Sequence, residues 1–180
     1  MSTEQLSSPP ESPFSPQPAS NLGFADSWRR VITDPSGFFA DMPHSGGLQE
    51  PLVFLGVCAV LNAVGSLLFG WGVFGAVWGA VGFVLGAFVA GIALTLIAQQ
   101  LFDGRAGFEQ MFRVVAYAAA PLVFLWVPRL WPFALVYAWF LQVRGVQRVN
   151  DFEAVPAVLT VMLKTGVLLL VLAALRGWHF

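Results

Sequence analysis

Five apolar stretches run along the chain, separated by short breaks that contain glycine, proline or charged residues. A helix that crosses the roughly 30 Å hydrocarbon core of a bilayer needs about 20 mostly apolar residues. The second stretch is longer than that, which predicts a tilted helix whose ends lie among the headgroups. The pattern therefore predicts an all-α fold, a polytopic transmembrane bundle of five helices at about residues 51–70, 73–102, 112–128, 130–143 and 155–175.

The third and fourth stretches are shorter than a full span, and the break between them contains Pro128 and Pro132. Trp126 and Trp131 lie beside this break, and tryptophan is enriched where membrane helices meet the interface. The tryptophans favour two complete crossings. The lengths also fit a re-entrant hairpin that enters the bilayer and returns to the same side. Both interpretations stay open at this point.

An amphipathic segment, residues 23–50, precedes the first apolar stretch. Trp28, Val31 and Ile32 have the i, i+3, i+4 spacing of one helix face, and Pro35 predicts a break before a second short helix. We expect this segment to lie on the cytoplasmic membrane surface, because aromatic-rich amphipathic helices bind in the interface. The alternative is a docking site for a protein partner on the cytoplasmic face. The candidate contact residues are Trp28, Phe38 and Phe39, with Arg105 and Phe108 from a later loop.

The composition also indicates a membrane protein. Hydrophobic residues make up 57% of the chain and charged residues 11%, against about 45–50% and about 25% in soluble domains. Residues 1–22 are rich in serine and proline, so we expect a disordered tail there, and they lack the basic and apolar regions of a signal peptide. Acidic and basic residues are balanced, and no basic run suggests a nucleic-acid partner.

Arginine positions set the expected orientation, because basic residues are enriched in cytoplasmic loops. With a cytoplasmic N-terminus and a C-terminus on the opposite side, six arginines fall on the cytoplasmic side and two on the other. A re-entrant hairpin would move one of those two and leave the termini unchanged. The six are Arg29, Arg30, Arg105, Arg113, Arg144 and Arg148, and the two are Arg129 and Arg176.

Lys164, Asn62 and Tyr117 form a candidate polar site inside the membrane. A lysine near the middle of a span costs about 2.5–3.5 kcal/mol on insertion scales, so Lys164 is expected to face the bundle. It would then line a binding site or ion path, or be held structurally with Asn62 or Tyr117 as its partner. A shifted span would instead let it snorkel to the interface. Asn62 is expected to form a hydrogen bond between helices.

Small residues recur along the second stretch at a spacing that lets helix backbones approach closely. We expect this face to pack within the bundle, with a homo-oligomer as the alternative. In the third stretch, Pro121 removes one helical hydrogen bond and predicts a kink near Tyr117. The small residues are Gly72, Gly75, Gly79, Gly82, Gly86 and Ala90.

Catalytic combinations are missing from the predicted spans. His44 and His179 lie outside them, and neither Cys58 nor Ser66 has an acid or base at the same depth. No residues have metal-ligand spacing and no glycine loop fits a phosphate, so we expect no metal and no cofactor. We expect a non-enzymatic membrane-organising or adaptor protein with a cytoplasmic contact surface. The alternative is a small transporter or channel subunit with a polar path at the candidate intramembrane site, although the internal repeats common in transporters are absent.

Several segments follow each other in an order known from one family. An element with Trp28 comes before a first span that opens at Pro51. The loop of residues 103–110, Asp-Gly-Arg-Ala-Gly-Phe-Glu-Gln, leads into a helix in which Tyr117 precedes Pro121 by four residues. In these features the chain resembles the Yip (Ypt-interacting protein) domain family of five-span membrane proteins.

The resemblance covers the chain from about Trp28 to the C-terminus and is closer to the prokaryotic-type branch. It implies a non-enzymatic protein that organises membranes or binds partners, and we expect it in the bacterial inner membrane. Eukaryotic members are implicated in vesicle traffic and in contacts with small GTPases. Their acidic Asp-Leu-x-Gly-Pro motif before the membrane has no match here; residues 34–37, Asp-Pro-Ser-Gly, are only loosely similar.

Overall fold

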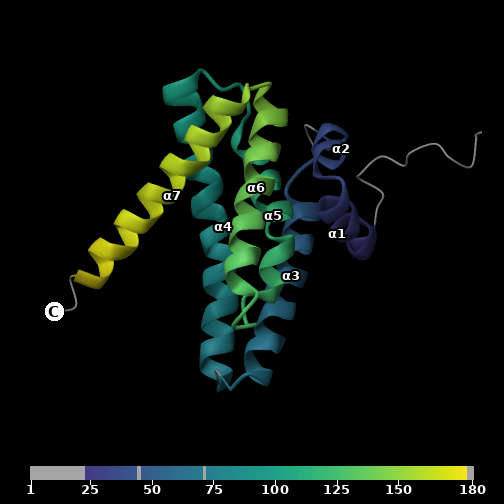
Figure 1. The fold of residues 1–180 in the computed structure, drawn as a ribbon, viewed down its shortest axis with the longest axis vertical. Helices are drawn as coiled ribbons and strands as arrows, with labels where there is room; N and C mark the ends of the chain where they lie inside the picture. Colours follow the sequence, from purple (N-terminus) through teal and green to yellow (C-terminus); the bar gives the residue numbers. More distant parts are fainter. Residues whose placement is uncertain (1–22, 44–45, 71, 178–180) are drawn as a thin grey trace, which may run out of the picture.

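The computed structural model describes residues 23–43, 46–70 and 72–177, where the regular elements are all helices and no strand is present. The order of elements is α1 (Phe24–Thr33), α2 (Pro35–Ala40), α3 (Gln49–Leu68), α4 (Gly72–Phe102), α5 (Phe108–Ala118), the 3-10 helix η2 (Ala120–Phe124), α6 (Trp131–Asn150) and α7 (Ala154–Gly177). Helices α3 to α6 run side by side, and α1 and α2 lie against the side of this bundle (Figure 1). The predicted all-α fold is confirmed.

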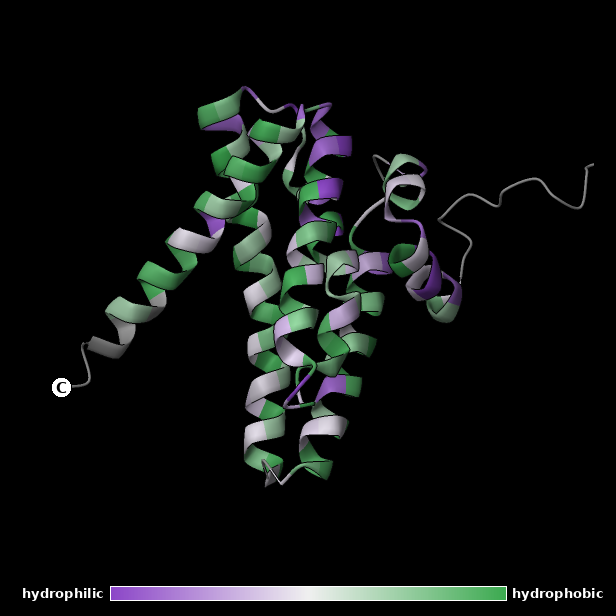
Figure 2. Ribbon diagram, viewed as in Figure 1, coloured by the Kyte–Doolittle hydropathy of each residue, from purple (hydrophilic) through white to green (hydrophobic). Residues whose placement is uncertain are grey.

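Three helices in the described part of the chain are long and apolar enough to cross a membrane: α3, α4 and residues Ala154–Val171 of α7. Large apolar side chains are exposed along these helices, whose ribbons are coloured mostly as apolar or neutral in Figure 2. A soluble monomer does not expose apolar surface on this scale. The chain is therefore a polytopic membrane protein. Among the large exposed apolar side chains are Val60, Leu68, Trp78, Leu85, Ile92, Leu163 and Leu170.

The third and fourth predicted spans form a hairpin of unequal helices. Helix α5 has 11 residues and is only about 16 Å long, whereas α6 has 20 residues but carries polar side chains in its last turns. Near Pro121 the structure differs from the predicted kink, because α5 ends at Ala118 and the chain continues as η2. Pro121 lies in the first turn of η2, where its missing N–H leaves no hydrogen bond unmade. The count of five spans stays a prediction.

Helix α5 lies at the centre of the bundle, between α3, α4 and α6. Every residue from 111 to 121 is buried. Close packing there depends on Gly145 of α6, because a Cβ at this position would lie 2.4 Å from a methyl group of Val114 and 3.2 Å from the ring of Phe39. The small residue brings α6 against both α5 and α2.

The apolar face of α1 and α2 is buried against the bundle. Val31 is fully buried, the Trp28 indole donates a hydrogen bond to the carbonyl of Ala120 (3.0 Å), and the Tyr137 hydroxyl donates to the carbonyl of Ile32 (2.6 Å). Both segments are therefore amphipathic helices, but their apolar face contacts α5, α6 and η2. The expected position of residues 23–50 on the membrane surface stays a prediction.

Helix α7 packs on the bundle only through its first half. Ala157, Thr160, Val161 and Lys164 are buried against α4 and α6, while the following residues lean away from the other helices (Figure 1). Large side chains are exposed along residues 167–171, with Leu170 at 72%. In a bilayer this half of α7 contacts lipid.

The middle of the small-residue stripe of α4 does not face the bundle, although Ala90 of the same stripe is buried as predicted. A Cβ added at Gly79, Gly82 or Gly86 would meet no atom within 4 Å. The prediction that this stripe packs within the chain is wrong at these positions, because α4 contacts its neighbours through another face. That face contains Ala76, Ala87, Ala90, Gly91, Leu94, Thr95 and Ala98.

Candidate functional site

Polar side chains gather at one end of the bundle, where α4 and α6 end and α5 and α7 begin. Figure 2 shows this end and the outer side of α1 as the main hydrophilic surfaces. We call it the polar end and define it by residues 99–113 and 144–153. It contains most of the charged side chains of the helical bundle, and the opposite end is largely apolar.

The loop between α4 and α5 is held at both of its sides. The Gly104 N–H donates to the carbonyl of Ala98 (2.9 Å), and the Ala106 N–H donates to the side-chain oxygen of Asn150 (3.0 Å). Gln99 donates to the carbonyl of Ala106 (3.0 Å). Glycine is required at position 104, because a Cβ would come within 2.8 Å of the Asn150 oxygen. Residues 103–107 therefore have one fixed backbone conformation.

The five predicted contact residues have different exposures. Arg105 projects from the fixed loop into solvent. Phe108 is half-buried beside two phenylalanine rings. Trp28 is half-buried and donates a hydrogen bond to η2. Phe38 and Phe39 are 1% and 2% exposed, so neither offers a surface while α2 stays docked. Of the predicted set, Arg105 is the side chain open to a partner.

A second polar cluster joins the start of α3 to α5. The Arg113 side chain is buried, and its Nη2 donates to the carbonyl of Gly47 (2.7 Å) and to the Glu109 carboxylate (3.2 Å). The same carboxylate accepts from the Gly47 N–H (2.8 Å). Glu109 and Arg113 are four residues apart on α5, the spacing of a helical ion pair. The cluster fixes the backbone that leads from α2 into α3.

The candidate intramembrane residues do not meet in one site. Lys164 donates to the side-chain oxygen of Gln142 on α6 (2.7 Å), so its partner is neither of the two residues expected. Asn62 donates to the carbonyl of Leu122 in η2 (2.9 Å), a bond between helices as expected. Tyr117 packs between phenylalanine rings of α2 and α3. These polar groups belong to three separate contacts in the bundle.

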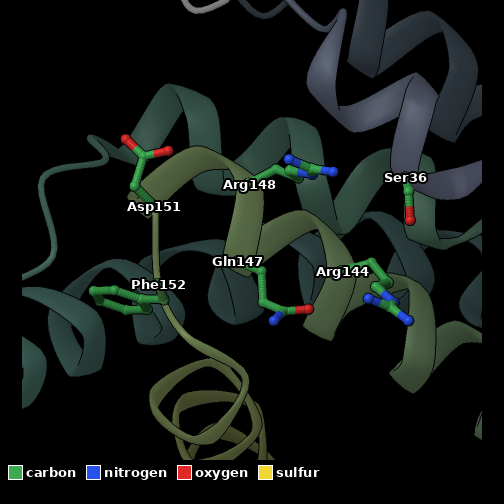
Figure 3. A pocket seen from close by; sticks show the side chains of 6 residues that line it. All are labelled: Ser36, Arg144, Gln147, Arg148, Asp151 and Phe152. Carbon is green, nitrogen blue, oxygen red and sulfur yellow. The ribbon is translucent and has the colours of Figure 1, made fainter.

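A polar pocket of about 340 Å³ lies between the last turns of α6 and the start of α2. Figure 3 shows the guanidinium groups of Arg144 and Arg148 pointing toward α2, whereas the Asp151 carboxylate points away from them. Among the described residues, neither arginine forms an ion pair. The pocket is lined by Ser36, Arg144, Gln147, Arg148, Asp151 and Phe152.

Comparison with known protein families identifies the family of this chain. A model of the Yip1 domain matches residues 29–175, which is most of the chain. The protein belongs to the Yip1 domain family. The searches of curated proteins and of solved structures found no match. The Yip1 domain here comprises α1 from Arg29 onward, the whole bundle and nearly all of α7.

Sequence reasoning missed four polar side chains that organise this Yip1 domain. Glu109 and Arg113 had a usable signal in their spacing of four residues. Gln142 and Asn150 had none, because their partners, Lys164 and the 103–107 loop, are distant in sequence. Only the folded bundle places these groups side by side.

Proposed function

We propose that this Yip1-domain protein is a non-enzymatic membrane-organising or adaptor protein whose contact surface is the polar end of the bundle. Members of the family are in general not enzymes. The surface is centred on Arg105, and the observation that carries the proposal is the fixed conformation of the loop around it. A prearranged surface loses little conformational entropy when a partner binds.

Charge supports a cytoplasmic location for this surface. The polar end carries Arg105, Arg113, Arg144 and Arg148, while the turn before α6 carries Arg129. Basic residues are enriched on the cytoplasmic side of membrane proteins. We therefore propose that the polar end faces the cytoplasm, in keeping with a bacterial inner-membrane location.

A transporter or channel role has less support. Lys164 and Asn62 each have a protein hydrogen-bond partner, and these partners lie on different elements. The two residues thus contribute to separate contacts between helices, and no shared polar path leads from one to the other in the described residues.

Site-specific photo-crosslinking tests the adaptor role. A photoreactive amino acid replaces Arg105 in one variant and Arg129, also exposed, in a matched control, and both are irradiated in native membranes. We expect a defined protein adduct at position 105 that is absent at position 129. Arg105→Glu should remove the same partner from a pull-down, while Arg129→Glu keeps it. Equal adducts at both positions, or none at position 105, would refute the proposal.

A further inference from the structure

One face of α6 carries two adjoining hollows. The polar pocket described above lies over its last turns. An apolar groove of about 780 Å³ lies over its first turns, lined by Pro132, Phe133, Val136, Tyr137 and Phe140. Positions 133, 136/137, 140, 144, 147/148 and 151 recur at steps of three or four residues, so both hollows follow one stripe of the helix.

The two hollows meet at Phe140 and Arg144. The Arg144 guanidinium lies 5.2 Å from the centre of the Phe140 ring, a cation–π distance. Beside them, the Tyr137 hydroxyl of the groove is hydrogen-bonded to α1, and Ser36 of α2 lines the polar pocket. The stripe is therefore apolar at one end and cationic at the other.

The cationic end has charge that the protein does not neutralise. Arg144 and Arg148 have no ion pair among the described residues, and the single acid in the pocket, Asp151, points away from them (Figure 3). Two guanidinium groups that line one pocket can each donate hydrogen bonds to a phosphate.

The stripe from Arg144 to Phe133 is about as long as an acyl chain. Phe133 and Arg144 are 11 residues apart in α6, a rise of about 16 Å along the helix. Half of a typical hydrocarbon core is about 15 Å. An acyl chain that starts at the level of Arg144 would therefore end near Phe133.

We infer that this face of α6 is a binding site for one anionic phospholipid, with its phosphate between Arg144 and Arg148 and an acyl chain in the groove from Phe140 to Phe133. The site lies on α6 and α2 and does not include Arg105. Arg144 and Arg148 belong to the polar end, so the site shares part of the partner surface proposed above but not its centre, Arg105.

Native mass spectrometry of the full chain tests this site. Protein in detergent is incubated with equimolar phosphatidylglycerol and phosphatidylcholine, and the ratio of the retained lipids is measured. Each arginine near an anionic headgroup contributes about fivefold in affinity. We expect wild type to favour phosphatidylglycerol, Arg144→Gln and Arg148→Gln each to lower the ratio about fivefold, and the double variant about 30-fold.

Two further variants separate the interpretations. Arg29→Gln/Arg129→Gln removes two exposed arginines elsewhere and should leave the lipid ratio unchanged. Val136→Trp fills the groove and should lower phosphatidylglycerol retention with both arginines intact. Melting temperatures of all variants show that each one is folded.

Three results would overturn the inference: no preference in wild type, an unchanged preference in the folded double arginine variant, or an equal loss in the Arg29/Arg129 control. Soluble glycerol phosphate that binds as tightly as the lipid, and equally to Val136→Trp, would identify a free phosphate site instead. Photo-crosslinking at position 105 is read independently, so either proposal can fail without the other.

Discussion

Asn150 shows how a single buried side chain can position a loop. Its oxygen accepts from the Ala106 N–H, and its amide nitrogen donates to the carbonyl of Val146 within α6 (3.1 Å). Both ends of the amide are thereby used, as expected for a buried polar group. The 103–107 loop is fixed to α6 through this one residue.

Asn150→Ala should destabilise the protein by about 1–3 kcal/mol, because it leaves the buried Ala106 N–H without a partner. The free energy of unfolding in detergent measures the effect. Gln147→Ala, at a half-buried position of the same helix, serves as the control and should change stability by less than about 0.5 kcal/mol. Equal losses in both variants would contradict the role of Asn150.

Lys164 and Gln142 should be coupled in stability. A double-mutant cycle of Lys164→Met and Gln142→Leu is expected to give a coupling energy of about 0.6–1.7 kcal/mol, the range for hydrogen bonds between membrane helices. Unfolding of the four proteins in detergent provides the values. A coupling energy near zero would mean that the 2.7 Å contact does not hold α7 to α6.

At the scale of elements, the helices with a long apolar pattern were the most predictable. The first span was expected at residues 51–70 and lies at Gln49–Leu68, and the second is one helix, Gly72–Phe102. The third was not predicted well, because apolar residues continue beyond Ala118 while the helix does not. The end of α5 depends on the missing N–H of Pro121 and on the burial of α5 on all sides. A hydropathy pattern contains neither kind of information.

Two glycines that look alike in the sequence should respond oppositely to alanine. Gly145→Ala should destabilise by about 1–3 kcal/mol through overpacking against Val114. Gly82→Ala should stabilise by about 0.5–1 kcal/mol, because its Cβ meets nothing and alanine is the better helix former. Unfolding in detergent measures both. A homo-oligomer formed through the α4 stripe would reverse the sign at Gly82, and chemical crosslinking would then show a loss of oligomer.

The docking of α2 makes a second prediction at this scale. Phe39→Ala should lower the free energy of unfolding by about 3–5 kcal/mol, the usual cost of removing a buried phenylalanine. Ala40→Ser, at the exposed neighbouring position, should have almost no effect. If the two variants have the same free energy of unfolding in detergent, α2 does not pack on the bundle there.

For the whole molecule, hydropathy predicted a polytopic helical membrane protein, and both the fold and the Yip1 family agree. The candidate site was less predictable. Lys164 and Arg105 stood out in the sequence, yet their surroundings depend on contacts that no local pattern encodes: the partner of Lys164 on another helix, and the anchor of the Arg105 loop on Asn150. Phe38 and Phe39 stood out as a possible surface and are instead part of the core.

The topology prediction applies to the entire chain. Single cysteines at positions 105 and 129 should be labelled by a membrane-impermeant thiol reagent from opposite sides of the membrane, in a background where Cys58 is replaced by alanine. The two positions are labelled from opposite sides if α5 together with η2 crosses the membrane once and α6 crosses it back. Labelling of both positions from the cytoplasmic side would indicate the re-entrant hairpin and three crossings.

The docking of α1 also has a consequence for synthesis on the ribosome. Its two hydrogen bonds to the bundle join residues 92 and 105 positions apart. At about 5–20 residues per second, about 5–20 s pass between translation of Ile32 and translation of Tyr137. For that time the apolar side of α1 has no final partner, and the bilayer surface is the nearest place to shield it. Docking of this helix would then be a transfer from lipid to protein that follows formation of the α5–α6 hairpin.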